Sequence, residues 1–210
     1  MQHMRGKETV AVFENVVKWR KGRSIGIEKF SMSIQKAEKI LVYGNSGMMR
    51  ELYRVFAQLE KPDNGIRKIY GQLAYVPTKF PLWDDLRVQD YLFLMLRDRK
   101  KKHAGEVIEM WKESLLWKKR TFQIQHLSDW EKEKLLYLMA FLRNPDILVI
   151  GNIGKVFTRE EEKELWNMVD RYRTINQVAV LCVSEYKEEP YQFDCIYRVL
   201  NGKIVREGEQ

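Results

Sequence analysis

The sequence predicts one α/β domain over residues 1–210, with a parallel sheet, an N-terminal antiparallel β subdomain and an inserted helical subdomain at about 87–141. Three observations predict this class. Short, continuous apolar runs typical of strands buried on both faces alternate with helical stretches. The first strands instead alternate apolar and polar residues, and the chain closes with a hairpin sequence. With 210 residues and 45% hydrophobic content, the chain can bury one sizeable core.

The predicted strands follow in order along the chain. TVAVFENVVKW (9–19) alternates as a half-buried strand does, and IGIEKFSMSI (25–34) repeats the pattern after a turn-like RKGRS, which predicts antiparallel strands. The buried parallel strands are KILVYG, DILVIGN and VAVLCVSE, at 39–44, 146–152 and 178–185. IYRVLNGKIVREG predicts a hairpin that turns at Asn201 and Gly202. The predicted helices span 88–98, 104–116, 129–142 and 159–172.

Composition limits the setting in which the protein works. The formal net charge of +8 suggests an anionic neighbour, either nucleic acid or the inner face of a membrane. No apolar run approaches the roughly 20 residues of a membrane span, and no signal-peptide pattern is present, so we expect a cytoplasmic protein. Cys182 and Cys195 lie in apolar stretches and are predicted to be buried free thiols. His103 and His126 have no spacing for catalysis or metal binding, so no metal site is expected.

The stretch ILVYGNSGMMREL (40–52) reads as a strand, a glycine loop and a helix, which is the context of a phosphate-binding loop. Such a loop, G-x-x-x-x-G-K-[ST], supplies backbone amides and a lysine to phosphates and a hydroxyl to magnesium. Gly44, Asn45, Ser46 and Gly47 fit its beginning. They are therefore candidate nucleotide-binding residues.

The later positions depart from this motif. Met49 stands at the second glycine, Arg50 at the lysine and Glu51 at the hydroxyl residue. We expect Met49 to crowd a ligand where positive φ is favoured, and Glu51 to repel phosphate by about 4 kcal/mol per charge pair. Arg50 keeps a positive charge but on a bulkier, planar group. Alternatively, Glu51 itself occupies the anion site at a helix N-terminus and pairs with Arg50.

Several further landmarks follow one another at consistent spacing. They are NVVKW, AYVPTKFPLWDDLRVQDYL, LSDWEKEKLLYLMAFLRNPDILVI and VLCVSE. In this order they resemble the ATP-binding subunits of ABC transporters over essentially the whole chain. The resemblance implies a P-loop NTPase core with a parallel sheet, in a single ABC-type ATP-binding domain.

The resemblance also implies roles that the residues present do not fit. Thr78 stands where the Q-loop glutamine is expected, and Glu185 where a histidine would contact the γ-phosphate. Gly151 and Asn152 stand where the family places a magnesium-binding aspartate and a water-positioning glutamate. Asp146 cannot replace them, because it begins its strand, about 16 Å from the carboxyl end where ligands bind.

Two aromatic residues lie at positions that face nucleotide in the family. Trp19 matches a ring that packs against adenine, although a strand aromatic there needs no ligand. Leu127 and Ser128 match the signature loop, which closes on nucleotide held by the opposite subunit. Asp129 and Trp130 stand at its glycine positions and add a charge and a large ring.

A permease-docking surface is implied after the Q-loop. There the family receives a short cytoplasmic helix of the membrane subunit, and this chain offers Phe80, Leu82 and Trp83 as large apolar anchors. The alternative is that these side chains fold inward as core.

Together these departures predict a non-catalytic subunit without a cofactor, peripheral on the inner face of the cell membrane. Its expected partners are a membrane permease and a second ATP-binding subunit, in a homodimer or heterodimer. One open alternative is weak ATP binding or slow hydrolysis through Trp19, Gly44, Gly47 and Arg50. The other is a nucleic-acid-associated relative, but no nucleic acid is expected because the basic residues are dispersed among acidic ones.

Overall fold

The computed structural model describes residues 8–19, 26–44, 46–77, 83–97, 104–151, 158–187 and 191–208. Its strands are β1 (Thr9–Trp19), β2 (Gly26–Gln35), β3 (Lys39–Gly44), β4 (Asn64–Ile69), β5 (Leu73–Tyr75), β6 (Ile147–Gly151), β7 (Ala179–Ser184), β8 (Cys195–Leu200) and β9 (Lys203–Arg206). Its helices are α1 (Ser46–Phe56), α2 (Val88–Arg97), α3 (Ala104–Glu113), α4 (Asp129–Phe141) and α5 (Arg159–Asn176), with 3₁₀ turns η1 (Leu115–Trp117) and η2 (Ile124–His126).

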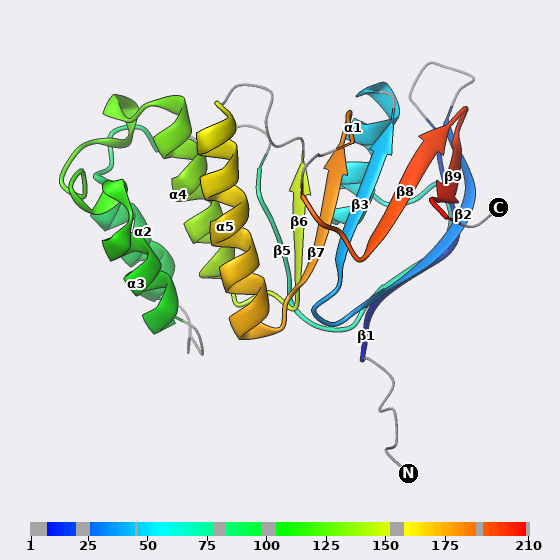
Figure 1. The fold of residues 1–210 in the computed structure, drawn as a ribbon, viewed down its shortest axis with the longest axis horizontal. Coiled ribbons are helices and arrows are strands. Elements are labelled where there is room, and N and C mark those ends of the chain that lie inside the picture. Colours follow the sequence, from blue (N-terminus) through cyan, green and yellow to red (C-terminus); the bar gives the residue numbers. More distant parts are fainter. Residues whose placement is uncertain are drawn as a thin grey trace, which may run out of the picture.

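Two sheets organise these elements (Figure 1). The central sheet has six strands in the order β5-β6-β7-β3-β8-β9, and all its neighbours are parallel except the β8–β9 hairpin. The smaller sheet has the order β2-β1-β4 and is antiparallel. The predicted α/β class, with its N-terminal antiparallel β part and inserted helices, is confirmed.

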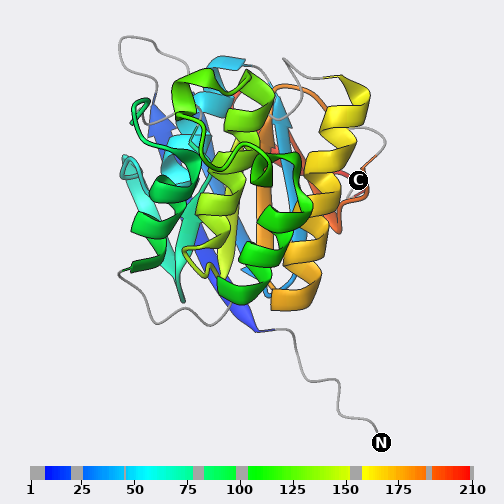
Figure 2. The ribbon, with the colours of Figure 1, turned by 90° about the vertical axis from the view of Figure 1, so that its left-hand side faces the viewer.

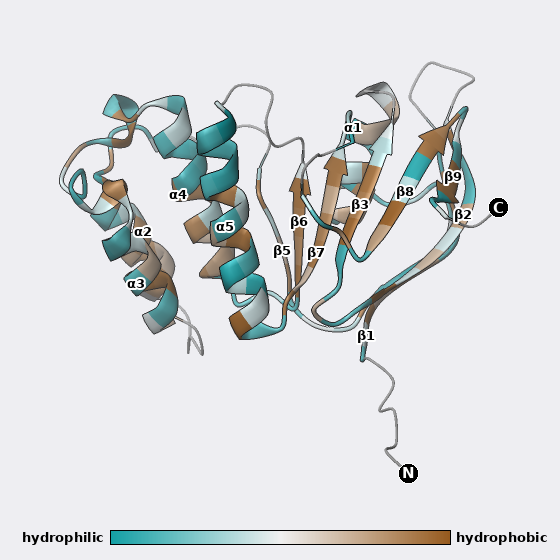
Figure 3. Cartoon of the chain, in the orientation of Figure 1, coloured by the Kyte–Doolittle hydropathy of each residue, from teal (hydrophilic) through white to brown (hydrophobic). Residues whose placement is uncertain are grey.

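Helices cover both faces of the central sheet. On one face lie α4 and α5, with α2 and α3 beyond them (Figures 1 and 2). On the other face α1 packs between the two sheets, where Phe56 contacts Phe13 and Phe30 at ring-centroid distances of 5.0 and 6.1 Å. In β3, Leu41 packs into the apolar cluster formed with α4 and α5, and Val42 packs into the cluster formed with α1 on the other face. This burial on two faces explains the continuous apolar runs, which Figure 3 shows in hydrophobic colours in β6 and β7.

Some element boundaries differ from the sequence prediction. Helix α3 ends before 116, because the Ser114 hydroxyl donates a hydrogen bond to the Trp111 carbonyl at 2.7 Å and a 3₁₀ turn follows. Helix α5 continues past 172 and stops where Gln177 adopts the left-handed conformation, with φ of 56°. The predicted hairpin turn is confirmed at Asn201 and Gly202, with φ of 48° and 86°.

The two cysteines lie in different environments. Cys182 is buried in β7, as predicted, but Cys195 is only half-buried, so the prediction of a buried thiol is wrong there. Its Sγ donates to a Glu38 carboxylate oxygen at 3.2 Å and accepts from the Arg206 guanidinium at 3.1 Å, and these polar partners suit a surface position. Both thiols are free. Among the helices that the structure describes, none is long and apolar enough to cross a membrane.

Candidate functional site

The carboxyl ends of β3, β6 and β7 meet at one edge of the central sheet, where ligands bind in open α/β folds. Helices α4 and α5 each run back to the opposite edge before the parallel strand that follows them, so their N-termini lie at this edge too (Figure 1). The N-terminus of α1 joins them directly after β3. The candidate phosphate-loop and signature-loop residues are therefore at the same edge of the molecule.

The expected phosphate loop is almost entirely replaced by helix. Strand β3 ends at Gly44 and α1 already begins at Ser46, so only Asn45, which lies outside the described residues, separates them. Gly47 lies inside the first turn of α1. From Arg50 onward each N–H of this helix has a carbonyl acceptor four residues earlier, which leaves only first-turn amides free to meet an anion. No acidic residue lies in that turn.

The early helix start turns Met49 toward the core. Its side chain is 3% exposed and packs in the cluster that contains Leu52 and Phe56, on the same helix face. The expectations that Met49 crowds a ligand and needs positive φ are therefore wrong, because residue 49 is helical and points inward.

Arg50 and Glu51 lie in the second turn of α1. Arg50 is exposed and Glu51 half-buried, and within the described chain neither forms an ion pair. The alternative in which Glu51 occupies the helix N-terminus and pairs with Arg50 is wrong, because the helix begins five residues before Glu51.

The packing of two strands explains why position 44 must be a glycine. It pairs with Val199 across β3 and β8, and a Cβ added at Gly44 would lie 2.8 Å from the Val199 carbonyl oxygen. The glycine is thus needed for strand packing, independently of any ligand.

Trp19 ends β1 at the same edge and is 52% exposed. Its backbone N–H donates to Asp63 at 2.6 Å, and its ring lies against Gly26, where an added Cβ would come within 2.8 Å of it. Lys18 supports this corner by pairing with Asp63 at 3.1 Å. The indole is held in place and partly open to solvent.

The signature-loop residues begin helix α4. Leu127 is buried, and Ser128 forms a capping box: its hydroxyl accepts from the Glu131 N–H at 3.2 Å, and its own N–H donates to the Glu131 carboxylate at 2.9 Å. Asp129 is the first helical residue. Trp130 packs against the core, with the Lys134 ammonium 4.7 Å from its ring centroid.

The remaining positions at which the resemblance implies reactive residues are spread over both edges of the sheet. Gly151 ends β6, whereas Asn152 and Thr78 fall outside the described residues. Asp146 directly precedes β6 and accepts a hydrogen bond from the Gln72 N–H at 2.7 Å, so it lies at the edge opposite the candidate site. Glu185 directly follows β7 at the candidate edge. Within the described residues no group of His, Cys, Asp and Glu side chains could hold a metal ion.

One residue near this edge was missed in the sequence. Burial raises the pKa of Glu133, in α4, to about 7. Its charge acts on Tyr53 of α1, whose pKa burial raises and whose hydroxyl donates a short hydrogen bond to the Val76 carbonyl just after β5. Glu133 lies within the charged run EKEK, and nothing in that pattern distinguishes it from the other charged residues of the run.

The predicted docking surface is only partly described. Phe80 and Leu82 lie outside the described residues, and Trp83 is 58% exposed, with its ring centroid 5.9 Å from that of Tyr91. For Trp83, the alternative of an inward-facing core residue is wrong. A groove of about 490 Å³ lies here, lined by Trp83, Asp84, Asp85, Leu86 and Leu94.

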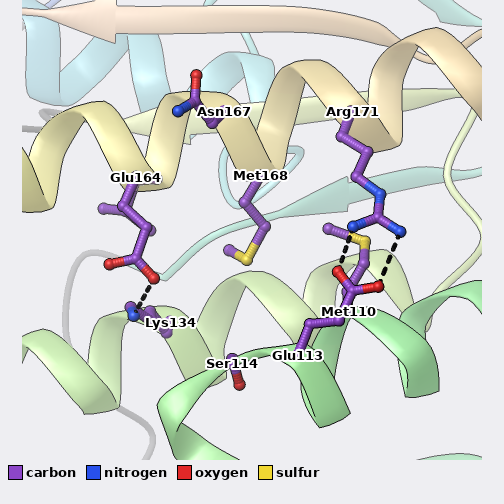
Figure 4. Close-up of a pocket in the computed structure, with 9 residues that line it drawn as sticks. Met110, Glu113, Ser114, Lys134, Glu164, Asn167, Met168 and Arg171 are labelled. Carbon is purple, nitrogen blue, oxygen red and sulfur yellow. Dashed lines mark hydrogen bonds and ion pairs between the residues drawn. The ribbon is translucent and has the colours of Figure 1, made fainter.

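A second cavity, of about 230 Å³, lies between α5 and the helices α3 and α4 (Figure 4). Met110 and Met168 line it, and two ion pairs span it: Lys134 with Glu164, and Arg171 with Glu113 at 2.5 Å. Because both acidic and basic side chains in it are already paired, it offers no net charge to a ligand.

Sequence comparisons find relatives among ABC-transporter ATP-binding proteins. The zinc import ATP-binding protein ZnuC of Acinetobacter baylyi is 30% identical over 176 residues, which cover 81% of this chain and 66% of that protein. An uncharacterised ABC transporter ATP-binding protein of Methanocaldococcus jannaschii is 23% identical over 200 residues, or 93% of this chain and 76% of that protein. The chain therefore spans about two thirds to three quarters of the length of these relatives.

A solved structure of an ATP-binding subunit of an ABC transporter has the same fold. It matches with a TM-score of 0.79 over 94% of this chain and 89% of that chain, at 16% identity. No protein-family model matches the sequence.

Proposed function

Since the chain belongs to the family of ABC-transporter ATP-binding subunits, we propose that it is a non-catalytic member, which docks on a membrane permease as a scaffold or regulator. It keeps the fold and the docking surface of the family and has lost the ability to hydrolyse ATP. It acts in the cytoplasm, on the inner face of the cell membrane.

The observation that carries this proposal is the start of α1 at Ser46, directly after β3. A phosphate loop needs a run of non-helical residues whose amides curl around the phosphates. Here those residues form a helical turn, and Met49 is buried in the core. Opening the loop would require this turn to unwind and Met49 to leave its packing.

The residues at the other reactive positions support the same proposal. Phosphoryl transfer depends on positive charge and water placed around the γ-phosphate. Gly151 and Asn152 offer no carboxylate for magnesium or for water, and Glu185 adds a negative charge. Losing one such group slows catalysis, whereas losing all of them together removes the mechanism.

Weak ATP binding or slow hydrolysis is the second candidate, and one feature favours it. The first turn of α1 has free amides and no acidic residue, and a helix N-terminus with free amides attracts anions. The half-exposed Trp19 indole lies at the same edge of the molecule.

A Mg-ATP titration by calorimetry on the purified chain decides between the two candidates. We propose that no binding is measurable at ATP concentrations up to about 1 mM, the upper end of ordinary KM values. An intact ABC ATP-binding subunit, titrated in the same buffer, is the control. Saturable binding in the micromolar range would contradict the first candidate and favour the second.

The proposed partners are the permease and a second ATP-binding subunit, identical or different. In either dimer, one composite site would use this chain's α1 N-terminus and the other its signature-loop residues, and both would be defective. The permease contact is tested by co-purification from native membranes with a tagged Phe80→Ala and Trp83→Ala double variant. Undiminished recovery of the membrane protein by the folded variant would contradict docking at this surface.

A further inference from the structure

The groove at Trp83 is formed by a well-fixed turn between the strand region and α2. The Trp83 carbonyl accepts from the Leu86 N–H at 3.0 Å, and the Asp84 carbonyl accepts from the Gln125 N–H at 3.1 Å. Leu86 in turn accepts from the Ile124 N–H at 2.9 Å. Backbone hydrogen bonds to η2 therefore hold the groove in shape before any partner arrives, which lowers the entropy lost on binding.

Apolar side chains are exposed at this groove. Trp83 is 58% exposed, and Leu94, one of the lining residues on α2, is 44% exposed. Grouped large apolar side chains of this kind are the usual anchors of protein interfaces.

The charge of the groove is opposite to that of the chain. The protein carries a formal net charge of +8, yet the ionisable residues that line the groove are Asp84 and Asp85. The Oδ1 atom of Asp84 is buried and accepts no hydrogen bond within the described residues. A partner therefore meets the carboxylate of Asp85, which is exposed, and the remaining surface of the half-buried Asp84 side chain.

We propose that this groove selects a positively charged amphipathic helix of the partner protein. Apolar side chains of that helix pack on Trp83 and Leu94, while its lysine or arginine side chains pair with Asp84 and Asp85. This inference rests on the proposed docking function and specifies the chemistry of the docked segment.

The test uses two synthetic helical peptides of about 15 residues, or four turns. They share one Leu- and Phe-rich face and differ only in the polar face, which carries Lys and Arg in one peptide and Glu in the other. Binding of each fluorescein-labelled peptide to the full chain is measured by anisotropy. We expect the basic peptide to bind at least about tenfold more tightly, and its affinity to fall as salt rises from about 50 to 500 mM.

Two double variants assign the effect to the groove. Asp84→Asn with Asp85→Asn should weaken binding of the basic peptide at least about tenfold. Glu160→Gln with Glu162→Gln removes the same charge from the start of α5, away from the groove, and should leave binding unchanged. Circular dichroism spectra establish that each variant is folded. If both double variants weaken binding equally, only long-range charge is at work and the proposal is wrong.

Other outcomes overturn the proposal in recognisable ways. Equal affinity for the two peptides, or no binding of either, contradicts charge selection. Self-association that is lost in the Asp84 and Asp85 variant would make a second copy of the chain the occupant. If the peptide preference fails while the Phe80 and Trp83 variant still loses its membrane protein, docking stands and only the charge inference falls. If the basic peptide is preferred but the Phe80 and Trp83 variant recovers its membrane protein undiminished, the docking function falls and a charge-selective groove remains.

Discussion

Gly44 and Val199 pair across β3 and β8 so closely that a Cβ at position 44 would lie 2.8 Å from the Val199 carbonyl oxygen and 2.9 Å from its Cβ. Such atoms belong to the strand itself, and no side-chain rotation can move the carbonyl away. The first residue of the expected phosphate motif is therefore constrained by the packing of two strands.

We predict that Gly44→Ala lowers the free energy of unfolding by about 1–3 kcal/mol, the usual cost of overpacking. Urea unfolding followed by circular dichroism measures it. Gly105→Ala is the control. Within the described residues, no atom apart from its chain neighbours and its own helix backbone lies within 4 Å of an added Cβ there, and alanine favours the helix by up to about 1 kcal/mol. If Gly44→Ala proves as stable as the parent, packing does not explain the glycine.

Ser128 should act as a helix cap. Ser128 and Thr158 head matching capping boxes, in which their side chains accept from the N–H groups of Glu131 and Glu161 at 3.2 and 3.3 Å. We predict that Ser128→Ala and Thr158→Ala each lower the free energy of unfolding by about 1 kcal/mol in urea titrations. A loss at Thr158 with none at Ser128 would contradict the capping role and reopen a nucleotide role for the signature position.

The half-buried carboxylate of Glu133 should make stability depend on pH. Its pKa is raised by burial from 4.5 to about 7, so between these values the folded state holds a proton that the unfolded state has lost. The stability from this residue is therefore present below pH 4.5 and is lost as pH rises toward 7, by about 3 kcal/mol in all.

We expect Glu133→Gln to remove this dependence and to be more stable than the parent at pH 8, since no charge is then buried. Urea midpoints at pH 5, 6, 7 and 8 measure the difference between variant and parent. The exposed Glu160→Gln should follow the parent at every pH. A difference between Glu133→Gln and the parent that stays constant from pH 5 to 8 would contradict the raised pKa.

The sequence predicted the sheet and the main helices because their signals are local. Runs such as those of β6 and β7 need burial on both faces, and Asn201 with Gly202 favours one turn type. Strands β4 and β5 were not predicted, because they have no such signal. β4 is largely exposed and polar, and β5 has only three residues.

The candidate site was harder to predict because its geometry depends on tertiary packing. The motif spacing placed Met49 beside a ligand, but the helix begins earlier and the side chain joins the core. Glu133 could not be singled out, since its raised pKa comes from burial in the folded chain, where its charge acts on Tyr53 of α1, which is distant in sequence. Trp83 was predicted at a docking surface, and its exposure is consistent with that role.

The buried Lys39 ammonium should depend on its ion-pair partner Asp170 for stability. It is 3% exposed at the start of β3, 2.9 Å from Asp170 and 4.2 Å from the ring centroid of Trp166. Burial lowers its pKa, against the opposing effect of Asp170. We predict that Asp170→Ala lowers the free energy of unfolding by about 2 kcal/mol or more, because it leaves a buried charge unpaired.

Lys39→Met should change stability by no more than about 1 kcal/mol in either direction, since it removes the buried charge and keeps the packing. Thermal and urea unfolding of both variants at pH 7 compare them directly. A loss at Lys39→Met as large as that at Asp170→Ala would show that the ion pair itself stabilises the fold.

Restoring one family residue should not restore activity. Arg50→Lys returns the lysine of the phosphate motif, but Arg50 lies in the second turn of a helix that already begins at Ser46, so the loop that would surround the phosphates is still absent. The carboxylates for magnesium and water are also missing at Gly151 and Asn152, and groups that act as a unit do not add singly. We predict no phosphate release from Mg-ATP above background in either the parent or Arg50→Lys, measured beside an intact ABC ATP-binding subunit. A turnover of about 1 per second in the parent would place it among ordinary enzymes and contradict the non-catalytic proposal. Activity in Arg50→Lys alone would mean that α1 unwinds to admit nucleotide and that a single side chain limits the reaction.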